Sequence, residues 1–450
     1  MKKQFLRWVA FSLALLLLVP IFAGCSSKGK TLLTMNKDGV KVTFSVNYYR
    51  FLLSRLKGNY IDNQYVNESG KTADQDAFWQ VKDTYNGKTV QTLDEYLRGQ
   101  VLEDCQIFLA ALWLFEKSNL SLSEEAKASV EQEMTDLVND FGSGSKTKLN
   151  SILSDYGVNY DLLKEFYLIQ EKVKAVKNDL YGTNGSLIGI GIKEAYLSEN
   201  YIRFKQIYLP NYEYILETDE FGNVIYYDKD TKAILYDETG KIKTDANGQA
   251  ITDSFGNKIR YNADYSAILY DTVNGLPMQA TDESGNLLTR SLSAEELAAR
   301  YAHAQALCED LQSSSDETFD GTIASEHTEN GTDASEFTDG YYLRRGMDYS
   351  TYGTDLAYLT DILSTLETAE DGTVFLYVSP YGYHVIRKYT PASEAYQNEV
   401  NAVWFSTFAS DLIEKLFLEE CAKYFGDMER NESVYASVPD LTKISGTSIF

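Results

Sequence analysis

Two short apolar runs on either side of a tight turn constrain the fold of this chain more than any other feature. Residues 374–378 and 383–389 are rich in β-branched and aromatic residues, and residues 379–382 between them are Ser-Pro-Tyr-Gly. Such runs around a Pro/Gly turn are typical of an antiparallel hairpin. The sequence therefore predicts a β-hairpin near residue 380, with His384 in its second strand.

The N-terminus has the pattern of an export signal. A basic segment with Lys2, Lys3 and Arg7 precedes an apolar stretch at residues 9–22. This stretch is shorter than the ~20 residues that a membrane-spanning helix needs. We therefore expect a cleaved signal rather than a spanning helix.

Residues 22–25, Phe-Ala-Gly-Cys, resemble a bacterial lipobox. In that family the cysteine becomes the lipid-modified first residue of the mature protein. The resemblance implies a signal peptide at 1–24, lipidation at Cys25 and a polar tether at 25–30, and so a position on the extracytoplasmic face of the cell membrane. An ordinary secretory signal with a chance cysteine is the alternative.

The net charge of −25 narrows the classes of partner. So acidic a chain disfavours binding to nucleic acid and direct adsorption to anionic lipid, and it favours solubility. Beyond the lipobox, Cys105, Cys308 and Cys421 each fall on an apolar helical pattern. We expect buried free thiols there, because no close pair suggests a disulfide framework or a metal site.

Most of the first half is expected to be helical. After a predicted hairpin at 31–44, three long helices carry apolar residues at helical spacing. The first starts at Thr92 with a capping-box pattern, the second at Ser121 or Ser123, and the third near Asn159. Such apolar stripes are expected to pack on one another as a core rather than to bind a cofactor.

A strand at 203–209 opens the second half and is followed by an insertion at 211–291. Asx–Gly turns recur in the insertion between short Tyr/Ile/Val runs, which predicts a series of β-hairpins. The aspartates of these turns also raise calcium binding as an alternative. Lys232 disfavours it, because it stands at the fifth position of a loop that starts at Asp228, where an EF-hand needs an oxygen ligand.

Beyond the insertion, helices and strands alternate. The pattern predicts a long helix from Ser293, a short helix at 318–327, a strand within 339–347, a helix at 355–367 and then the hairpin. This order of strand, long helix, short helix, strand, helix, strand, strand resembles that of parvulin-type peptidyl-prolyl isomerases. Gly-Tyr-His-Val-Ile in the second hairpin strand is similar to their last strand.

Residues 31–200 resemble the helical chaperone region of the PrsA and SurA foldases. The two resemblances together imply an α+β chain. A discontinuous helical chaperone lobe at 31–200 is followed by a parvulin-like domain at 201–392, which carries the insertion. In this family the chain then returns to the lobe, which residues 393–450 are expected to do.

We expect one long helix at 393–425 in this last segment and a loose polar tail from Asp427, with 438–441 as a candidate for docking. The insertion joins the first strand of the parvulin-like domain to its long helix. We therefore expect the insertion to shape or cover the substrate slot of that domain.

The resemblance also implies a chemistry. Prolyl isomerisation breaks no covalent bond, and its barrier of about 20 kcal/mol is the loss of amide resonance as the peptide bond twists. An isomerase needs an apolar slot for the proline ring and groups that favour the twisted amide. In parvulins the polar groups are two histidines on adjacent central strands, with a Cys or Asp nearby.

Carried over residue by residue, the match is mixed. His384 corresponds to the C-terminal histidine, whereas Gln206 occupies the position of the first-strand histidine, and no residue at 328–330 clearly matches the Cys or Asp. The predicted slot residues are Leu343, Met347 and, in place of a phenylalanine, Tyr349 or Tyr352. Glutamine forms hydrogen bonds but does not titrate near neutrality, so a structural role for His384 is the alternative.

The implied function is that of a membrane-anchored extracytoplasmic folding factor. It would be a parvulin-type peptidyl-prolyl cis-trans isomerase acting on unfolded or partly folded exported proteins, without a cofactor or metal. One alternative is a holdase chaperone whose parvulin-like domain binds peptide without turnover. A solute-binding lipoprotein is a third class, which the lack of an alternating βαβ pattern disfavours.

Overall fold

The computed structural model describes residues 29–448 except for gaps at 68, 86–90, 328–338 and 354–355. The predicted signal peptide, the predicted lipidation site at Cys25 and residues 328–330 lie outside the described residues. Helices and strands are mixed throughout the rest, which confirms the α+β class expected from the sequence.

The chain divides into two compact units. The helical unit comprises residues 1–189 and 407–450, and the sheet unit comprises residues 190–406. These boundaries differ from the predicted ones at 200 and 392. Helix α8 (Ile190–Asn200) belongs to the sheet unit because it leads directly into the first strand of the sheet.

The helical unit starts with the predicted hairpin, β1 (Thr31–Lys37) and β2 (Val40–Ser45), followed by α2 (Val46–Asp62). A connection then contains α3 (Asp76–Trp79), β3 (Lys82–Asp83) and β4 (Gln91–Thr92). The body of the unit consists of α4 (Leu93–Lys117), α5 (Glu124–Asp140), α6 (Lys146–Ser154) and α7 (Tyr160–Tyr181), with the short turn η2 (Thr183–Gly185) at its end.

Side-chain caps explain where the long helices begin. Thr92 and Glu95 form the predicted capping box at the start of α4, in which each side chain accepts from the backbone N–H of the other residue. Ser123 caps α5 and Asn159 caps α7. The predicted starts of these helices are therefore confirmed, whereas α6, which has a short apolar stripe, was not predicted.

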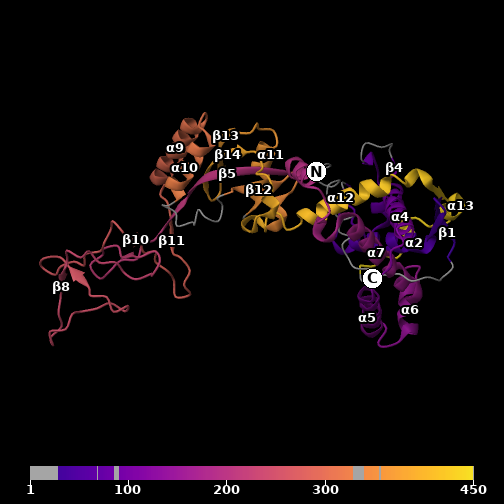
Figure 1. Cartoon of the computed structure of the whole chain (residues 1–450), viewed down its shortest axis with the longest axis horizontal. Helices are drawn as coiled ribbons and strands as arrows, with labels where there is room; N and C mark the ends of the chain where they lie inside the picture. Colours follow the sequence, from indigo (N-terminus) through magenta and orange to yellow (C-terminus); the bar gives the residue numbers. More distant parts are fainter. Residues whose placement is uncertain (1–28, 68, 86–90, 328–338, 354–355, 449–450) are drawn as a thin grey trace. The chain divides into compact units, whose positions relative to one another are not determined.

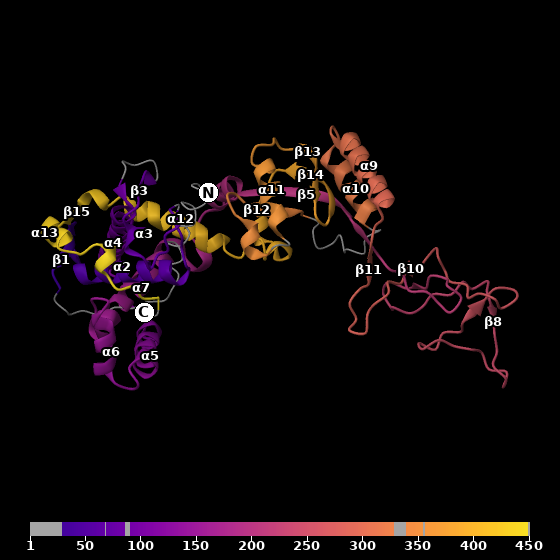
Figure 2. The ribbon, with the colours of Figure 1, turned by 180° about the vertical axis from the view of Figure 1, so that it is seen from behind.

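The C-terminal segment completes the helical unit. Helix α12 (Phe408–Ala422) packs on α4 and α7, and β15 (Met428–Arg430) pairs with β1. The remaining elements are η9 (Phe425–Asp427), α13 (Glu432–Ala436) and η10 (Leu441–Lys443). Figures 1 and 2 show these yellow elements among the indigo and purple ones.

The prediction of a loose tail from Asp427 is wrong, whereas the docking expected at 438–441 is confirmed, because Val438 and Leu441 belong to the main core. Leu441 is fully buried, and its backbone N–H donates to Asp94 Oδ1 at 2.7 Å. Asp94 itself is buried in α4, so this bond fixes the tail to the body of the unit. Only a few side chains of the tail face inward, so its sequence is mostly polar. Those few, Val434, Val438, Leu441 and Ile444, belong to the main core.

Replacing glycine by alanine is expected to have opposite effects on stability at Gly58 and at Gly99. Both lie inside long helices, where replacing glycine by alanine normally stabilises by about 0.5–1 kcal/mol. A Cβ at Gly58 would lie 2.2 Å from the carbonyl carbon of Thr447, whereas nothing lies within 4 Å of a Cβ at Gly99. We expect Gly99→Ala to raise the free energy of unfolding by about 0.5–1 kcal/mol and Gly58→Ala to lower it by about 1–3 kcal/mol. Urea titration measures both; equal stabilisation would mean that the chain end does not dock on α2.

The sheet unit contains one four-stranded antiparallel sheet. Its strands β5 (Tyr201–Pro210), β12 (Tyr341–Arg344), β13 (Val374–Ser379) and β14 (Gly382–Tyr389) lie in the order β12-β5-β14-β13. Strands β13 and β14 form the predicted hairpin around Pro380 and Tyr381, which is confirmed by their register from Ser379↔Gly382 onward.

Helices cover both sides of this sheet. Helices α9 (Ala294–Leu311) and α10 (Asp316–His327) pack on one side, and α11 (Ala357–Leu366) packs on the other (Figure 1). Ser293 and Glu296 form a capping box at the start of α9, as predicted. The short turn η5 (Tyr349–Tyr352) leads from β12 toward α11.

The predicted helix at 393–425 is wrong over its first half. The chain forms only the single turns η7 (Ala395–Gln397) and η8 (Glu399–Asn401) before α12 begins. The Phe405 ring packs on Tyr201 and Tyr342, at centroid distances of 5.1 and 4.9 Å. These contacts within the sheet unit outweigh the helical pattern of the sequence.

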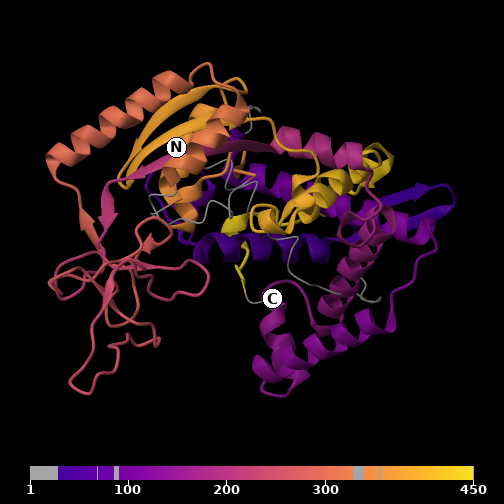
Figure 3. The same ribbon diagram turned by 60° about the vertical axis from the view of Figure 1, so that its left-hand side comes forward.

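The insertion forms three small two-stranded sheets. They pair β6 (Tyr212–Tyr214) with β11 (Thr289–Ser291), β7 (Tyr226–Tyr227) with β10 (Leu276–Pro277), and β8 (Lys241–Ile242) with β9 (Arg260–Tyr261). The predicted Asx–Gly turns are confirmed as local turns, for example at Asp253, whose Oδ1 accepts the N–H groups of Phe255 and Asn257. Figure 3 shows the insertion extending from the four-stranded sheet near the start of α9.

The insertion also contains an internal duplication that the hairpin pattern did not reveal. Residues 218–236 and 252–270 both begin with Thr-Asp-x-Phe-Gly-Asn and end with Ala-Ile-Leu-Tyr. The two final tyrosines, Tyr236 and Tyr270, pair as an antiparallel bridge with ring centroids 5.7 Å apart.

The contacts of these two tyrosines are reciprocal. The hydroxyl of Tyr236 donates to Asp253 in the second half, and that of Tyr270 donates to Asp219 in the first half, each at 3.2 Å. Reciprocal bonds of this kind are those that two copies related by a twofold axis make. The insertion is therefore a duplicated unit whose halves pack on each other.

Candidate functional site

The two central strands carry the residues predicted to form the polar part of the site. Alternate side chains of β5 and β14 face opposite sides of the sheet. Phe204 and Ile386 belong to the cluster that packs against α11. Gln206 lies two residues after Phe204, and His384 lies two residues before Ile386. Both therefore face the same side of the sheet as those residues, and the structure brings them together.

Hydrogen bonds fix both nitrogens of the His384 ring. Its Nδ1 lies 2.9 Å from Gln206 Oε1, and its Nε2 lies 2.8 Å from Ser379 Oγ. An amide oxygen only accepts, so Nδ1–H is the donor and Nε2 accepts from the Ser379 hydroxyl. The same hydroxyl oxygen accepts from the Tyr381 N–H at 3.1 Å. His384 is thus held in one tautomer and one orientation.

Tyrosine rings surround this imidazole. Tyr208 and Tyr358 stack on it at centroid distances of 4.8 and 5.1 Å, and Tyr377 lies at 6.1 Å with a tilted ring. Tyr381 meets Tyr358 edge to face at 6.4 Å and is 39% exposed. We call these four residues the tyrosine rim.

Burial makes His384 electrically neutral. The side chain is 2% exposed, and the loss of hydration lowers its pKa to about 4. The ring is therefore uncharged at neutral pH, and it cannot act as a cationic acid there. What the arrangement offers is a fixed polar centre beneath a partly exposed aromatic surface, which suits binding of a peptide more than proton transfer.

Comparison with known proteins assigns no family. No family model matches the chain, and no curated protein matches it. Within the described part of the chain, no group of three or more His, Cys, Asp or Glu side chains could hold a metal ion. No helix of that part is long and apolar enough to cross a membrane.

The predicted slot residues lie near one another but differ in accessibility. Leu343 is fully buried in the cluster against α11, so it supports the surface without lining it. Tyr349 packs on the same cluster, and its hydroxyl accepts from the Arg344 N–H at 2.8 Å. Tyr352 is 61% exposed and its hydroxyl approaches Met347 Sδ at 4.0 Å. The accessible surface at this end is therefore aromatic and sulfur-containing.

Three partners of His384 were not predicted. Tyr208 could have been found, because it follows Gln206 by two residues and so shares its side of the strand. Ser379 was recognised only as part of a turn, and Tyr358 comes from a helix whose placement over the sheet no local pattern indicates. The insertion was expected at the slot, and its first residue, Asn211, donates to the carbonyl oxygens of Tyr381 and Pro380 beside the tyrosine rim. Its base also packs against α9, where Arg290 binds both Glu213 and Glu296.

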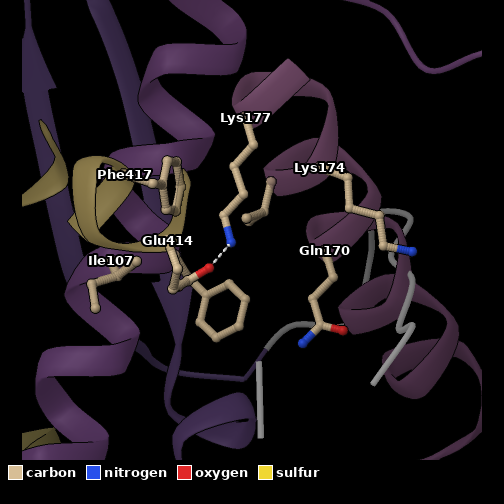
Figure 4. A pocket seen from close by; sticks show the side chains of 8 residues that line it. Ile107, Gln170, Lys174, Lys177, Glu414 and Phe417 are labelled. Carbon is tan, nitrogen blue, oxygen red and sulfur yellow. Dashed lines mark hydrogen bonds and ion pairs between the residues drawn. The ribbon is translucent and has the colours of Figure 1, made fainter. Parts of the chain in front are cut away.

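A cavity in the helical unit is a weaker candidate. It lies between α4, α7 and α12 and holds about 40 Å³ (Figure 4). Lys177 and Glu414 form an ion pair there, while Gln170 Oε1 and Glu414 Oε1 have no hydrogen-bond partner among the described residues. A cavity of this size is large enough for an ordered water beside the ion pair.

Three buried cysteines are the remaining candidates for a reactive group among the described residues. Cys105, Cys308 and Cys421 are free thiols, as predicted, and burial raises the pKa of each. A thiol with a raised pKa is a poor nucleophile at neutral pH. These residues therefore belong to the packing of the two units.

Proposed function

We propose that this chain is a membrane-anchored extracytoplasmic folding factor whose sheet unit is a parvulin-type peptidyl-prolyl cis-trans isomerase acting on exported polypeptides. One observation carries the proposal. The elements β5, α9, α10, β12, α11, β13 and β14 follow one another in the parvulin order, and His384 meets Gln206 at the centre of their sheet. The anchor at Cys25 is part of the proposal and rests on the lipobox resemblance.

The tyrosine rim supplies what isomerisation needs. A proline ring requires apolar surface, which the rings of Tyr208, Tyr358 and Tyr381 provide. The twisted amide is less conjugated than the planar one, and fixed dipoles near it favour the twisted form without moving a proton. The neutral His384, held by Gln206 and Ser379, is such a fixed group.

The division of the chain supports the foldase part of the proposal. The helical unit is interrupted by the whole sheet unit and is completed by the segment from residue 407. The resemblance to PrsA and SurA implies a chaperone lobe with this connectivity. In the proposal the helical unit holds an exported chain and the sheet unit acts on its proline-containing segments.

A holdase that binds peptide without turnover is the second candidate. Two observations favour it: His384 is only 2% exposed with both nitrogens bonded, and Leu343 has no exposed surface to line a slot. In this case the tyrosine rim binds segments of exported chains, and the glutamine in place of a histidine leaves them unconverted.

An isomerisation assay on a short Xaa-Pro peptide separates the two candidates. We expect the soluble protein from residue 26 to accelerate cis/trans conversion, and Tyr381→Ala to lower the catalysed rate about tenfold, which corresponds to about 1.4 kcal/mol of lost binding to the twisted peptide. Tyr301→Ala is the matched control, because Tyr301 has the same exposure of 39% but lies on α9 across the sheet.

Catalysis by the control variant should equal that of the unchanged protein. No acceleration by any form, together with suppressed aggregation of an unfolded protein, would replace the isomerase by the holdase. An equal loss of catalysed rate in Tyr381→Ala and Tyr301→Ala would show that the tyrosine rim is not part of the site.

A further inference from the structure

A groove with a mixed lining lies away from the tyrosine rim, where the base of the insertion meets α9 and α10. It holds about 700 Å³, within the ~300–1,000 Å³ typical of ligand sites. Leu216, Tyr227 and Leu276 contribute from the insertion, and Glu296, Arg300 and His303 from α9. Figure 3 shows the insertion and the start of α9 together at this end of the unit.

A chain of ion pairs holds the two walls of the groove in place. Arg300 of α9 donates to Pro210 O at 2.9 Å and to Glu213 at 3.0 Å. Glu213 also accepts from Arg290 at 2.6 Å, and Arg290 in turn binds Glu296 of α9 at 2.7 Å. Because these bonds join β6 and β11 to α9, the groove is formed before any ligand arrives.

The wall contributed by the insertion is apolar and exposed. Leu216 is 38% exposed and Leu276 is 43% exposed, although both are large aliphatic side chains. Tyr227 and Pro277 extend the same wall. Leucines at this level of exposure leave apolar area for a partner to cover.

The opposite wall is acidic. Glu296, Arg300 and His303 recur along one face of α9, and Glu326 of α10 lies beside them. The guanidinium groups of Arg290 and Arg300 are occupied by Glu213 and Glu296. The carboxylates of Glu213, Glu296 and Glu326 line the groove against the one guanidinium of Arg300, and Glu326 Oε2 lies 3.1 Å from His303 Nε2. The excess charge of the wall is therefore negative, in a chain whose net charge is −25.

We propose that this groove binds an extended polypeptide segment in which apolar and basic residues alternate. Side chains of an extended chain point alternately to opposite sides, so one set meets the leucines of the insertion and the other meets the carboxylate of Glu326 on α10. The proposal deepens the proposed function, because it gives the class of exported segment that the sheet unit selects at a second place.

Labelled eight-residue peptides test the groove. We expect an alternating Leu/Lys peptide to bind the soluble protein at least tenfold more tightly than alternating Leu/Glu or Ser/Lys peptides, measured by fluorescence anisotropy at low ionic strength. Leu276→Ser and Glu326→Gln should each weaken its binding at least fivefold. Leu287→Ser is the matched control, since Leu287 is 47% exposed on the insertion but does not line the groove.

The results separate this inference from the proposed function. Catalysis of a short Xaa-Pro peptide should be unchanged in Leu276→Ser, because the groove and the tyrosine rim lie on opposite sides of the sheet. Leu/Lys binding without any isomerisation would support the groove while removing the isomerase. Equal binding of all three peptides, or equal effects of Leu276→Ser and Leu287→Ser, would overturn the groove.

Discussion

Removal of the chain from Met428 onward is expected to unfold the helical unit and to leave the sheet unit folded. The removed segment buries Val434, Val438, Leu441 and Ile444, each at most 7% exposed, in the main core of the helical unit. Four such side chains contribute roughly 6–12 kcal/mol. A typical domain has a net stability of only about 5–15 kcal/mol, so the loss is of the same size as the whole stability.

Hydrogen exchange followed by mass spectrometry measures this result, because it reports each unit separately. Amides of α4 and α7 should exchange freely in the truncated protein, whereas those of β5 and β14 should stay protected. Protection of α4 and α7 at their original level would show that the tail is a peripheral addition.

A point substitution tests the same contact without truncation. We expect Leu441→Ala to lower the free energy of unfolding of the helical unit by about 2–5 kcal/mol, since it leaves a cavity in a packed core. Lys443→Ala is the control from the same turn, because the Lys443 side chain is 72% exposed. The control should change stability by less than about 0.5 kcal/mol. Equal small effects of both substitutions would contradict the docking of this turn.

The tail also shows where sequence patterns stop being informative. Helix starts at Thr92, Ser123, Asn159 and Ser293 could be predicted because a cap is a local bond between residues three apart in sequence. The hairpin around Pro380 was likewise encoded by its own turn. Structure that depends on neighbours a few residues away in sequence could therefore be predicted.

Contacts between segments that are distant in sequence could not be predicted from it. The bond between Leu441 and Asp94 spans 347 residues, and nothing near Leu441 in sequence indicates its partner. The helical pattern of residues 393–407 failed for the same reason, since Phe405 is held by rings of the sheet unit. In the duplicated insertion, each half has the pattern of simple hairpins, while its tyrosine binds an aspartate of the other half.

Part of the candidate site could likewise be predicted from the sequence, and part could not. The meeting of Gln206 and His384 was predictable from strand alternation once the strands were placed side by side. Their partners Ser379 and Tyr358 come from a turn and from a helix above the sheet, and only the packed structure brings them to the imidazole. Burial in this packed surrounding lowers the pKa of His384, and neither strand could indicate that burial alone.

Acidification from pH 7 to 4.5 is therefore expected to destabilise the sheet unit through His384. Its pKa is lowered to about 4 in the folded protein, against an ordinary value of about 6.5. Between these two values the unfolded chain binds more protons than the folded one, so stability rises with pH. The contribution of His384 is complete above about pH 6.5 and is lost as the pH falls toward 4, by roughly 2–3 kcal/mol at pH 4.5.

Comparison with His384→Gln isolates this contribution, because carboxylates titrate alike in both proteins and cancel in the difference. The unchanged protein should lose about 2–3 kcal/mol more than the variant between the two pH values, measured by urea unfolding.

Direct titration by NMR remains decisive if His384→Gln does not fold. The chain contains three histidines, so the resonance of each ring can be assigned by substitution of the other two. We expect the ring of His384 to titrate near pH 4. A midpoint near 6.5 would mean that water reaches the imidazole, and that the tyrosine rim and the bonds to Gln206 and Ser379 do not enclose it. In that case His384 would be free to carry charge at the surface, and the fixed neutral centre on which the proposed isomerase depends would not exist.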